Sequence, residues 1–463
     1  MHRRYFTCFA FTLSVALAVG TAGQPEAASP ENRSPVDLPV MYRTDREPAD
    51  DASPPATPPE PKGDLELREA LSLALLHNPE LASFSIEVRA TEARALQAGL
   101  RPNPEFDVEV ENFAGSVALR RFDETETTVQ LGQLIELAGK RRKRARVASL
   151  ERDLAGWDYE AKRADVMTET SKAFVEVLAA QERLALTQDL LRLAEQTFET
   201  VSARVQAGKV SPIEETKAGV ALANSRIEHA RSRRSLEAAR KKLATAWGSG
   251  APAFDKAVGK LDRVWPIPPA DQLSQEIRRN PDIARWAVEK EQRRAAVALQ
   301  EAGKVPDPTL SGGVRHFRES GDRAFAAAIS IPLPLFDRNQ GGVLEARRRL
   351  AKAEREQAAA ESRAHAALAG TVQALTIAYA EIDALRSAIL PGAQSAFEAA
   401  GEGYRQGKFG FLDVLDAQRT LFEAKGMYVD ALAAYHRGIA DLERITGKGF
   451  DPGNPSSFGS EDR

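Results

Sequence analysis

The chain contains an internal repeat, and no other feature of the sequence limits its fold more. Asn78-Pro79-Glu80-Leu81 returns as Asn280-Pro281-Asp282-Ile283, and Gly208-Lys209 returns as Gly407-Lys408. Residues 98–104 return as 302–308, and Trp247-Gly248 ends the first copy where Thr446-Gly447 ends the second. Because the intervals between these pairs are nearly constant, the chain is expected to fold as two similar halves.

Each half predicts the same order of elements: a helix, two short strands, a very long helix, a tight turn and another long helix. Residues 138–207 contain no proline, and as one helix they would extend about 105 Å at about 1.5 Å per residue. Residues 343–406 predict a second such helix, interrupted only near Pro391-Gly392. These two rods are the largest elements expected in the chain.

After each turn, large and small residues recur with a seven-residue period. In the second half the two series are Val414, Leu421, Tyr428, Tyr435 and Leu442, and Ala417, Ala424, Ala431 and Gly438. In the first half they are Leu222, His229, Leu236 and Leu243, and Ala218, Ser225, Ser232, Ala239 and Ala246. This pairing of large and small positions predicts closely packed antiparallel coiled coils. The two Gly-Lys turns are then hairpin tips, since glycine can end a helix in the left-handed conformation.

Two pairs of short segments alternate between apolar and polar residues. They predict strands over about 104–113, 123–134, 308–317 and 323–334. In the first segment, Phe106, Val108 and Val110 alternate with acids. Strict alternation over about ten residues is the weak signature of a transmembrane β-strand. The pattern also fits two amphipathic hairpins on a soluble domain, and the alternation does not decide between the two.

Opposite the apolar series, the first two predicted strands carry six acids and neither lysine nor arginine. These acids are Glu105, Asp107, Glu109, Glu111, Glu124 and Glu126. If the apolar series faces lipid, alternation places these carboxylates in the lumen of a channel. Rings of carboxylates concentrate cations and repel anions. Because tight binding would stop flow, the acids are expected to steer ions, and no metal site is predicted.

The remaining segments lie outside the repeat. Residues 1–23 predict a signal peptide, and 24–63, with ten prolines, predict a disordered linker. The halves are expected at 64–248 and 270–447, joined by a connecting segment at 249–269 and followed by a tail at 448–463. The only cysteine, Cys8, lies in the signal, so neither a disulfide nor a lipid attachment site is expected. After the signal no apolar run reaches the length of a membrane helix, so the exported chain is either soluble or inserted as strands.

The sequence offers no set of residues for catalysis. It contains neither a His-Glu-x-x-His pair nor a nucleophile elbow, and its histidines are not spaced for a metal. An enzyme is not expected, and no cofactor is predicted. The net charge of −3 does not favour nucleic acid. The basic run 140–144 therefore predicts a solvated face or a contact with anionic headgroups, and no nucleic-acid partner.

Four strands are too few to close a barrel, and unpaired strand edges are not tolerated in lipid. Outer-membrane barrels begin at about eight strands, and three chains would supply twelve. The predicted fold is therefore mainly α with a small β part. A trimer forms a 12-stranded barrel from four transmembrane β-strands per chain, continued by a long antiparallel coiled-coil α-barrel of about 100 Å.

Several motifs together resemble the TolC-like outer-membrane efflux family, most of all its cobalt–zinc–cadmium (CzcC-like) heavy-metal branch. They lie at residues 111–116, 133–141 and 331–341. Residues 403–407, followed by 413–417, look like the second hairpin tip of TolC itself. The resemblance covers roughly residues 65–447.

The resemblance implies a homotrimer whose hairpin tips dock on a periplasmic adaptor coupled to an inner-membrane pump. The tip residues expected to contact the adaptor are Gly208, Lys209, Ser211, Gly407, Lys408 and Gly410. The family's gate residues match Tyr404 and Glu214, and its two tip aspartates match Asp413 and Asp416. The family's gate arginine corresponds to Phe409, so this part of the gate network is expected to differ.

The predicted function is the trimeric outer-membrane channel of a tripartite, resistance-nodulation-division type efflux system, in contact with outer-membrane lipid and extending far into the periplasm. The acidic series favours divalent heavy-metal cations as the substrate. Two alternatives stay open. One is a duct for drugs or other organic solutes, and the other is a periplasmic coiled-coil scaffold whose hairpins do not enter a membrane.

Overall fold

The computed structural model describes residues 60–116 and 122–449, all within one unit of the chain, Thr57–Arg463. The predicted signal peptide, the linker up to residue 59 and the tail beyond residue 449 lie outside the described residues. The first half contains β1 (Gly63–Glu66), α1 (Leu67–His77), α2 (Pro79–Ala98), β2 (Glu105–Glu111), β3 (Glu126–Leu134), α3 (Lys140–Gln206) and α4 (Pro212–Thr245).

The second half repeats this order with small additions. After β4 (Phe254–Val258) in the connecting segment, it contains α5 (Ala270–Glu276), the 3-10 helix η3 (Ile277–Arg279), α6 (Pro281–Ala302), β5 (Thr309–Phe317), β6 (Arg323–Ser330), α7 (Gln340–Ala384), the π-helix η4 (Leu385–Ile389), α8 (Leu390–Arg405) and α9 (Phe411–Thr446). Across the described ranges, none of the helices is both long and apolar enough to cross a membrane.

The repeated Asn-Pro motif explains why the two halves fold alike. Asn78 and Asn280 are the N-caps of α2 and α6, and each side-chain oxygen accepts from a backbone N–H of the first turn. The Asn78 amide also donates to the carbonyl of Ala246 at 2.8 Å, just after α4. The Asn280 amide donates to the carbonyl of Ile445 at 3.0 Å, near the end of α9. The same residue thus starts one helix and binds the end of the last helix of its half.

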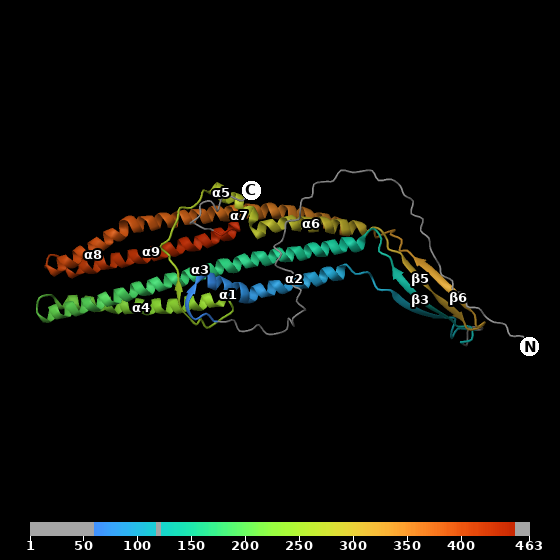
Figure 1. Ribbon diagram of the computed structural model, residues 1–463, viewed down its shortest axis with the longest axis horizontal. Helices are drawn as coiled ribbons and strands as arrows, with labels where there is room; N and C mark the ends of the chain where they lie inside the picture. The colour runs from blue at the N-terminus through green and yellow to red at the C-terminus, as the bar shows by residue number, and fades with distance from the viewer. Residues whose placement is uncertain (1–59, 117–121, 450–463) are drawn as a thin grey trace, which may run out of the picture. The chain divides into compact units, whose positions relative to one another are not determined.

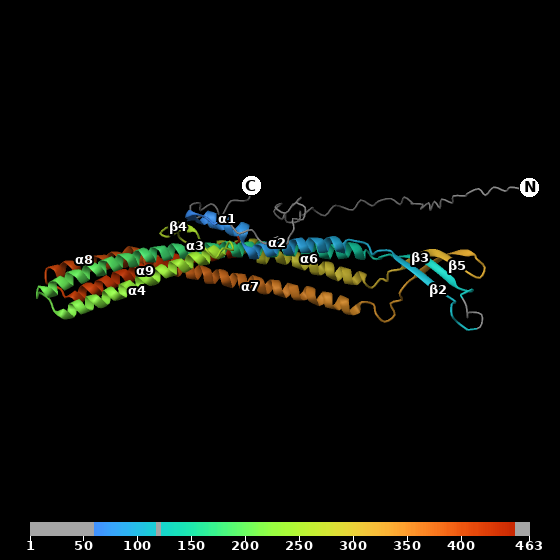
Figure 2. The same cartoon turned by 90° about the horizontal axis from the view of Figure 1, so that it is seen from below.

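The long helices pair as antiparallel hairpins, α3 with α4 and α8 with α9, and α3 also packs on α9 (Figure 1). Figure 2 shows the same hairpins extending away from the strands. Leu421, Tyr435 and Leu442 of the large heptad series are buried, as are Ala424 and Ala431 of the small series. The predicted interruption near Pro391 is a five-residue π-helix, which is consistent with the missing N–H of proline weakening the α-helical ladder.

The main core lies where the two halves meet, around Trp247, Phe254, Leu375 and Tyr435. The expected connecting segment 249–269 contributes to it, because β4 pairs in parallel with β1. The Tyr435 hydroxyl donates to the Trp265 carbonyl at 2.8 Å and accepts from its N–H at 3.1 Å. This buried polar contact fixes the connecting segment across α9. The sequence did not predict β1 or β4.

The four longer strands form one antiparallel sheet in the order β2-β3-β5-β6, so the β3–β5 pair joins the two halves. Val108 lies opposite Val129, Val129 opposite Val314, and Val314 opposite Phe325. One face of the sheet is therefore apolar and exposed, and the acids of β2 lie on the other face.

Two predicted strand ends are wrong. Glu124 lies in the turn before β3, which begins at Glu126, so this acid does not belong to the strand series. β6 ends at Ser330 and not near residue 334. Pro332 and Pro334 carry no N–H and cannot continue the hydrogen-bonded ladder.

The small heptad series predicts a paired mutational result in α9. A Cβ atom at Gly438 would lie 2.7 Å from Cδ2 of Leu375, which is buried, whereas a Cβ at Gly426 meets nothing within 4 Å. We expect Gly438→Ala to lower the free energy of unfolding by about 1–3 kcal/mol through overpacking. Gly426→Ala should raise it by about 0.5–1 kcal/mol, as expected for glycine replaced by alanine inside a helix. Thermal unfolding followed by circular dichroism checks both, and equal effects at the two positions would contradict the coiled-coil packing.

Candidate functional site

The two hairpin tips are built by the same backbone device. Gly208 and Gly407 follow α3 and α8 with φ of +65° and +72°, the left-handed conformation that glycine adopts without strain. The next N–H groups then return to the preceding helix: Lys209 donates to the Arg204 carbonyl at 2.9 Å, and Lys408 donates to the Gly403 carbonyl at 2.8 Å. All six tip residues predicted to contact an adaptor are exposed.

The helices that leave the tips are capped differently. Ser211 is the N-cap of α4, and its hydroxyl accepts from the Ile213 N–H at 3.5 Å. Gly410 is the N-cap of α9 and has no side chain, so the carboxylate of Asp413 accepts from the Gly410 N–H at 2.8 Å. Asp413, predicted as a tip aspartate, therefore also stabilises the start of its own helix.

The predicted gate residues Tyr404 and Glu214 lie in contact. The Tyr404 hydroxyl donates to the Glu214 carboxylate at 3.3 Å and joins α8 of one hairpin to α4 of the other. The Tyr404 ring packs against Phe411, with the ring centroids 5.9 Å apart. Phe411 is buried in a small core with Val201 and Ala218. The hydrogen bond therefore rests on an apolar contact between the two hairpins.

The sequence did not single out Arg204, which is also part of this contact. Its guanidinium carbon lies 4.5 Å from the centroid of the Tyr404 ring, within the range of a cation–π interaction. Phe409, which occupies the family's arginine position, lies against Gly403, and a Cβ at Gly403 would overlap its ring. The cation beside Tyr404 thus comes from the end of α3 and not from the second tip. We call Arg204, Glu214, Tyr404 and Phe411 the tip cluster.

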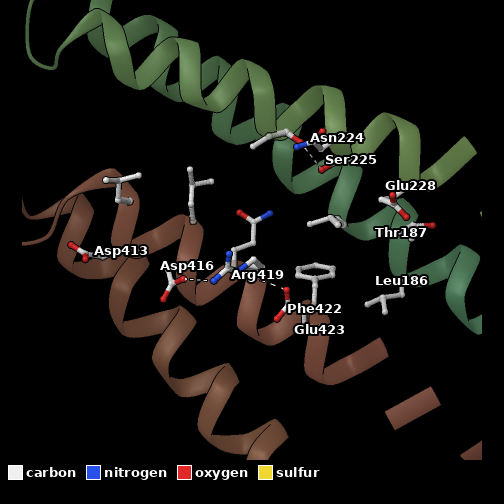
Figure 3. A pocket seen from close by; sticks show the side chains of 15 residues that line it. Leu186, Thr187, Asn224, Ser225, Glu228, Asp413, Asp416, Arg419, Phe422 and Glu423 are labelled. Atoms are coloured by element: carbon white, nitrogen blue, oxygen red, sulfur yellow. Dashed lines mark hydrogen bonds and ion pairs between the residues drawn. The ribbon is translucent and has the colours of Figure 1, made fainter. Parts of the chain in front are cut away.

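A groove of about 880 Å³ lies next to the tip cluster, between α9 on one side and α3 with α4 on the other (Figure 3). Asp413 and Asp416 line it, as the tip aspartates of the prediction, and Glu423 and Glu228 add two further acids. Figure 3 shows Asp416 and Arg419 directed toward each other, and their ion pair measures 3.0 Å. The groove therefore has mixed charge with an acidic excess.

The acids on the sheet are less uniform than predicted. Arg315 of β5 forms ion pairs with Glu126 at 3.0 Å and with Glu111 at 3.4 Å. Its Nε also donates to Thr128 at 2.9 Å, because β5 pairs with β3. The sequence series of β2 and β3 contains no basic residue, but the third strand places one among its acids.

Three acids of the series lie on the sheet without a basic partner among the described residues. Glu105, Asp107 and Glu109 have no ion pair among the described residues, although Asp107 accepts from the Gln130 amide at 3.0 Å. Within the same residues, no group of three or more His, Cys, Asp or Glu side chains is arranged to hold a metal ion. Five of the six predicted acids therefore share one face of the sheet, where Glu111 and Glu126 are paired with Arg315.

The sequence matches known proteins along most of its length. The outer membrane efflux protein family matches residues 70–249 and 272–448. The cobalt-zinc-cadmium resistance protein CzcC of Cupriavidus metallidurans is 36% identical over 394 residues, which cover 85% of this chain and 93% of that protein. The nickel and cobalt resistance protein CnrC of the same organism is 25% identical over 62% of this chain and 67% of its own length.

The fold matches solved channels as well. The open-state crystal structure of the Neisseria gonorrhoeae MtrE outer membrane channel superposes with a TM-score of 0.69 at 22% identity, covering 83% of this chain and 89% of that one. At this identity the likeness shows the fold. The predicted class, long coiled-coil helices with a small β part, is confirmed.

Proposed function

The chain belongs to the outer membrane efflux protein family, and from this premise we propose that it passes divalent heavy-metal cations out of the cell as the channel of a tripartite efflux system. It is an outer-membrane channel component whose long helices extend into the periplasm. The observation that carries the substrate class is its 36% identity, over 85% of the chain, to a protein named for cobalt, zinc and cadmium resistance. The pump and adaptor of a resistance-nodulation-division system are its partners.

The exposed apolar face of the sheet supports insertion as a trimer. Phe106, Leu131 and Phe325 on this face are 70%, 55% and 96% exposed in the single chain. β2 and β6 are edge strands of the four-stranded sheet. Three sheets joined edge to edge would pair these strands and turn the apolar face to lipid. The acids of β2 would then line the lumen.

Charge along the pathway supports cations. Glu105, Asp107 and Glu109 lie on the polar face of the sheet, and Asp413 and Asp416 lie at the tips. Each position is present three times in a trimer. Rings of carboxylates of this kind raise the local concentration of hydrated cations without holding them.

The substrate class predicts a selective phenotype. A strain that lacks the channel should become sensitive to zinc, cobalt and cadmium, and expression of this chain should restore tolerance. Sensitivity to organic drugs should change little.

In planar bilayers, the reversal potential across a salt gradient should show a cation preference that falls in Asp413→Asn with Asp416→Asn. Restored drug tolerance without metal tolerance would favour the organic-solute duct, and the absence of any channel activity would favour the scaffold.

We propose that the tip cluster holds the channel closed at its periplasmic end. A hydrogen bond to a carboxylate contributes about 1–3 kcal/mol, and an exposed cation–π contact about 0.5–1 kcal/mol. Tyr404→Phe removes the hydroxyl but keeps the ring, and Arg204→Gln removes the cation. Both variants should raise the single-channel conductance.

Tyr428→Phe in α9 is a matched control for loss of a phenol outside the cluster, and its conductance should equal that of the wild type. A conductance unchanged in both Tyr404→Phe and Arg204→Gln would contradict the gate.

We propose that Gly208, Lys209, Ser211, Gly407, Lys408 and Gly410 contact the adaptor. Ser211→Trp and Gly410→Trp should leave the trimer intact but abolish adaptor cross-linking and metal tolerance. Ser211→Ala loses the N-cap, which costs about 0.5–2 kcal/mol, without adding bulk, and should keep both activities. Ser235→Trp places the same bulk on the exposed face of α4 as a control. Tolerance that survives both tip variants would place the contact elsewhere.

A further inference from the structure

A cavity of about 500 Å³ lies where β3 passes into α3, at the end of the sheet nearest the helices. Three arginines line it: Arg101 after α2, and Arg141 and Arg142 in the first turn of α3. Gln133, Ile135 and Glu136 also contribute to its wall. It is separate from the tip cluster, which lies at the other end of the 67-residue helix α3.

The cavity carries a net positive charge that the chain itself does not neutralise. Glu136 is the acidic residue in the cavity wall. Both oxygens of the Glu136 carboxylate accept from the guanidinium of Arg144. Lys140 is paired with Asp307 at 2.7 Å. Lys140 and Arg144 of the basic run 140–144 are thus paired with acidic residues of the same chain. Arg101, Arg141 and Arg142 have no ion pair among the described residues.

The repeat shows that the fold does not require this charge. α3 begins with Lys140-Arg141-Arg142 after the N-cap Gly139, and α7 begins with Gln340-Gly341-Gly342 after the N-cap Asn339. Both caps adopt the left-handed conformation, with φ of +68° and +56°. The same backbone junction is therefore made once with two arginines and once with two glycines. Because α7 begins without basic residues, Arg141 and Arg142 are not needed to begin α3.

The cavity borders the apolar face of the sheet. Gln133 belongs to the same face of β3 as Leu131, and Leu131 lies opposite Phe106 of β2. Two residues along a strand correspond to about 7 Å. Exposed aliphatic and aromatic surface therefore reaches within two residues of Gln133, which lines the same cavity as the three arginines. Ile135, 38% exposed, continues the apolar surface to the cavity wall.

We propose that this cavity binds the headgroup of an anionic phospholipid, whose acyl chains lie along Phe106 and Leu131. Guanidinium groups bind phosphate oxygens through paired hydrogen bonds, and the adjoining apolar face favours a lipid over free phosphate. The assignment rests on the proposed function to the extent that the sheet lies in the outer membrane. A trimer has three such sites, all contributed by the first halves of its chains.

The test measures lipid binding by the detergent-solubilised trimer with two probes, dioleoylphosphatidylglycerol and dioleoylphosphatidylcholine. The wild type should bind the anionic lipid more tightly. Arg141→Gln with Arg142→Gln should weaken that binding about ten-fold or more, as expected for two basic residues at a membrane surface. Arg233→Gln with Arg234→Gln, an exposed adjacent pair on α4, is the matched control and should bind as the wild type does.

Three outcomes would overturn the site: equal binding of both lipids by the wild type, an equal loss in the control pair, or displacement of phosphatidylglycerol by inorganic phosphate alone. The last would identify a free-anion site. A second readout guards against misfolding, because phosphatidylglycerol should raise the unfolding temperature of the wild type and not of the Arg141→Gln, Arg142→Gln trimer. Since binding is measured without transport, a failed metal-tolerance test would leave this result unaffected.

Discussion

Close packing of long helices through small side chains is the constraint on which the rest of this structure depends. Each hairpin must bury a narrow apolar stripe along many turns, and it does so by placing Ala or Gly opposite Leu or Tyr. At Gly438 the backbone approaches Leu375 so closely that a methyl group would overlap it. This contact packs α9 on α7, and α9 packs on α3 as well. With the hairpins packed side by side, Tyr404 of one donates to Glu214 of the other.

The sequence predicted the features that local pattern determines. The Gly-Lys turns, the long helices and the alternating faces of β2 and β3 each follow from spacing within one segment. Tyr404 and Glu214 were paired through the family resemblance, and the structure brings them together. β1 and β4 were missed because four and five residues show little alternation, and each becomes a strand only by pairing with the other.

The residues that were not anticipated act across segments far apart in the chain. Arg315 enters the acidic series because β5 pairs with β3, and nothing near residue 126 indicates this. Arg204 reaches Tyr404 across two hairpins, so neither motif contains the signal. Glu124 was assigned to a strand by its alternation, but the pairing of β3 with β2 begins at Glu126. Tertiary pairing decided each of these cases.

The two tips are alike in backbone and different in chemistry. After the first tip, the hydroxyl of Ser211 caps α4. After the second tip, the N-cap Gly410 has no side chain, and the carboxylate of Asp413 accepts from its N–H. In the proposed trimer, three chains with two halves each would form a ring with approximate six-fold symmetry in its backbone and three-fold symmetry in its side chains. A partner with six equivalent arms meets two alternating chemical environments around this ring, whereas a partner with three can use a single one.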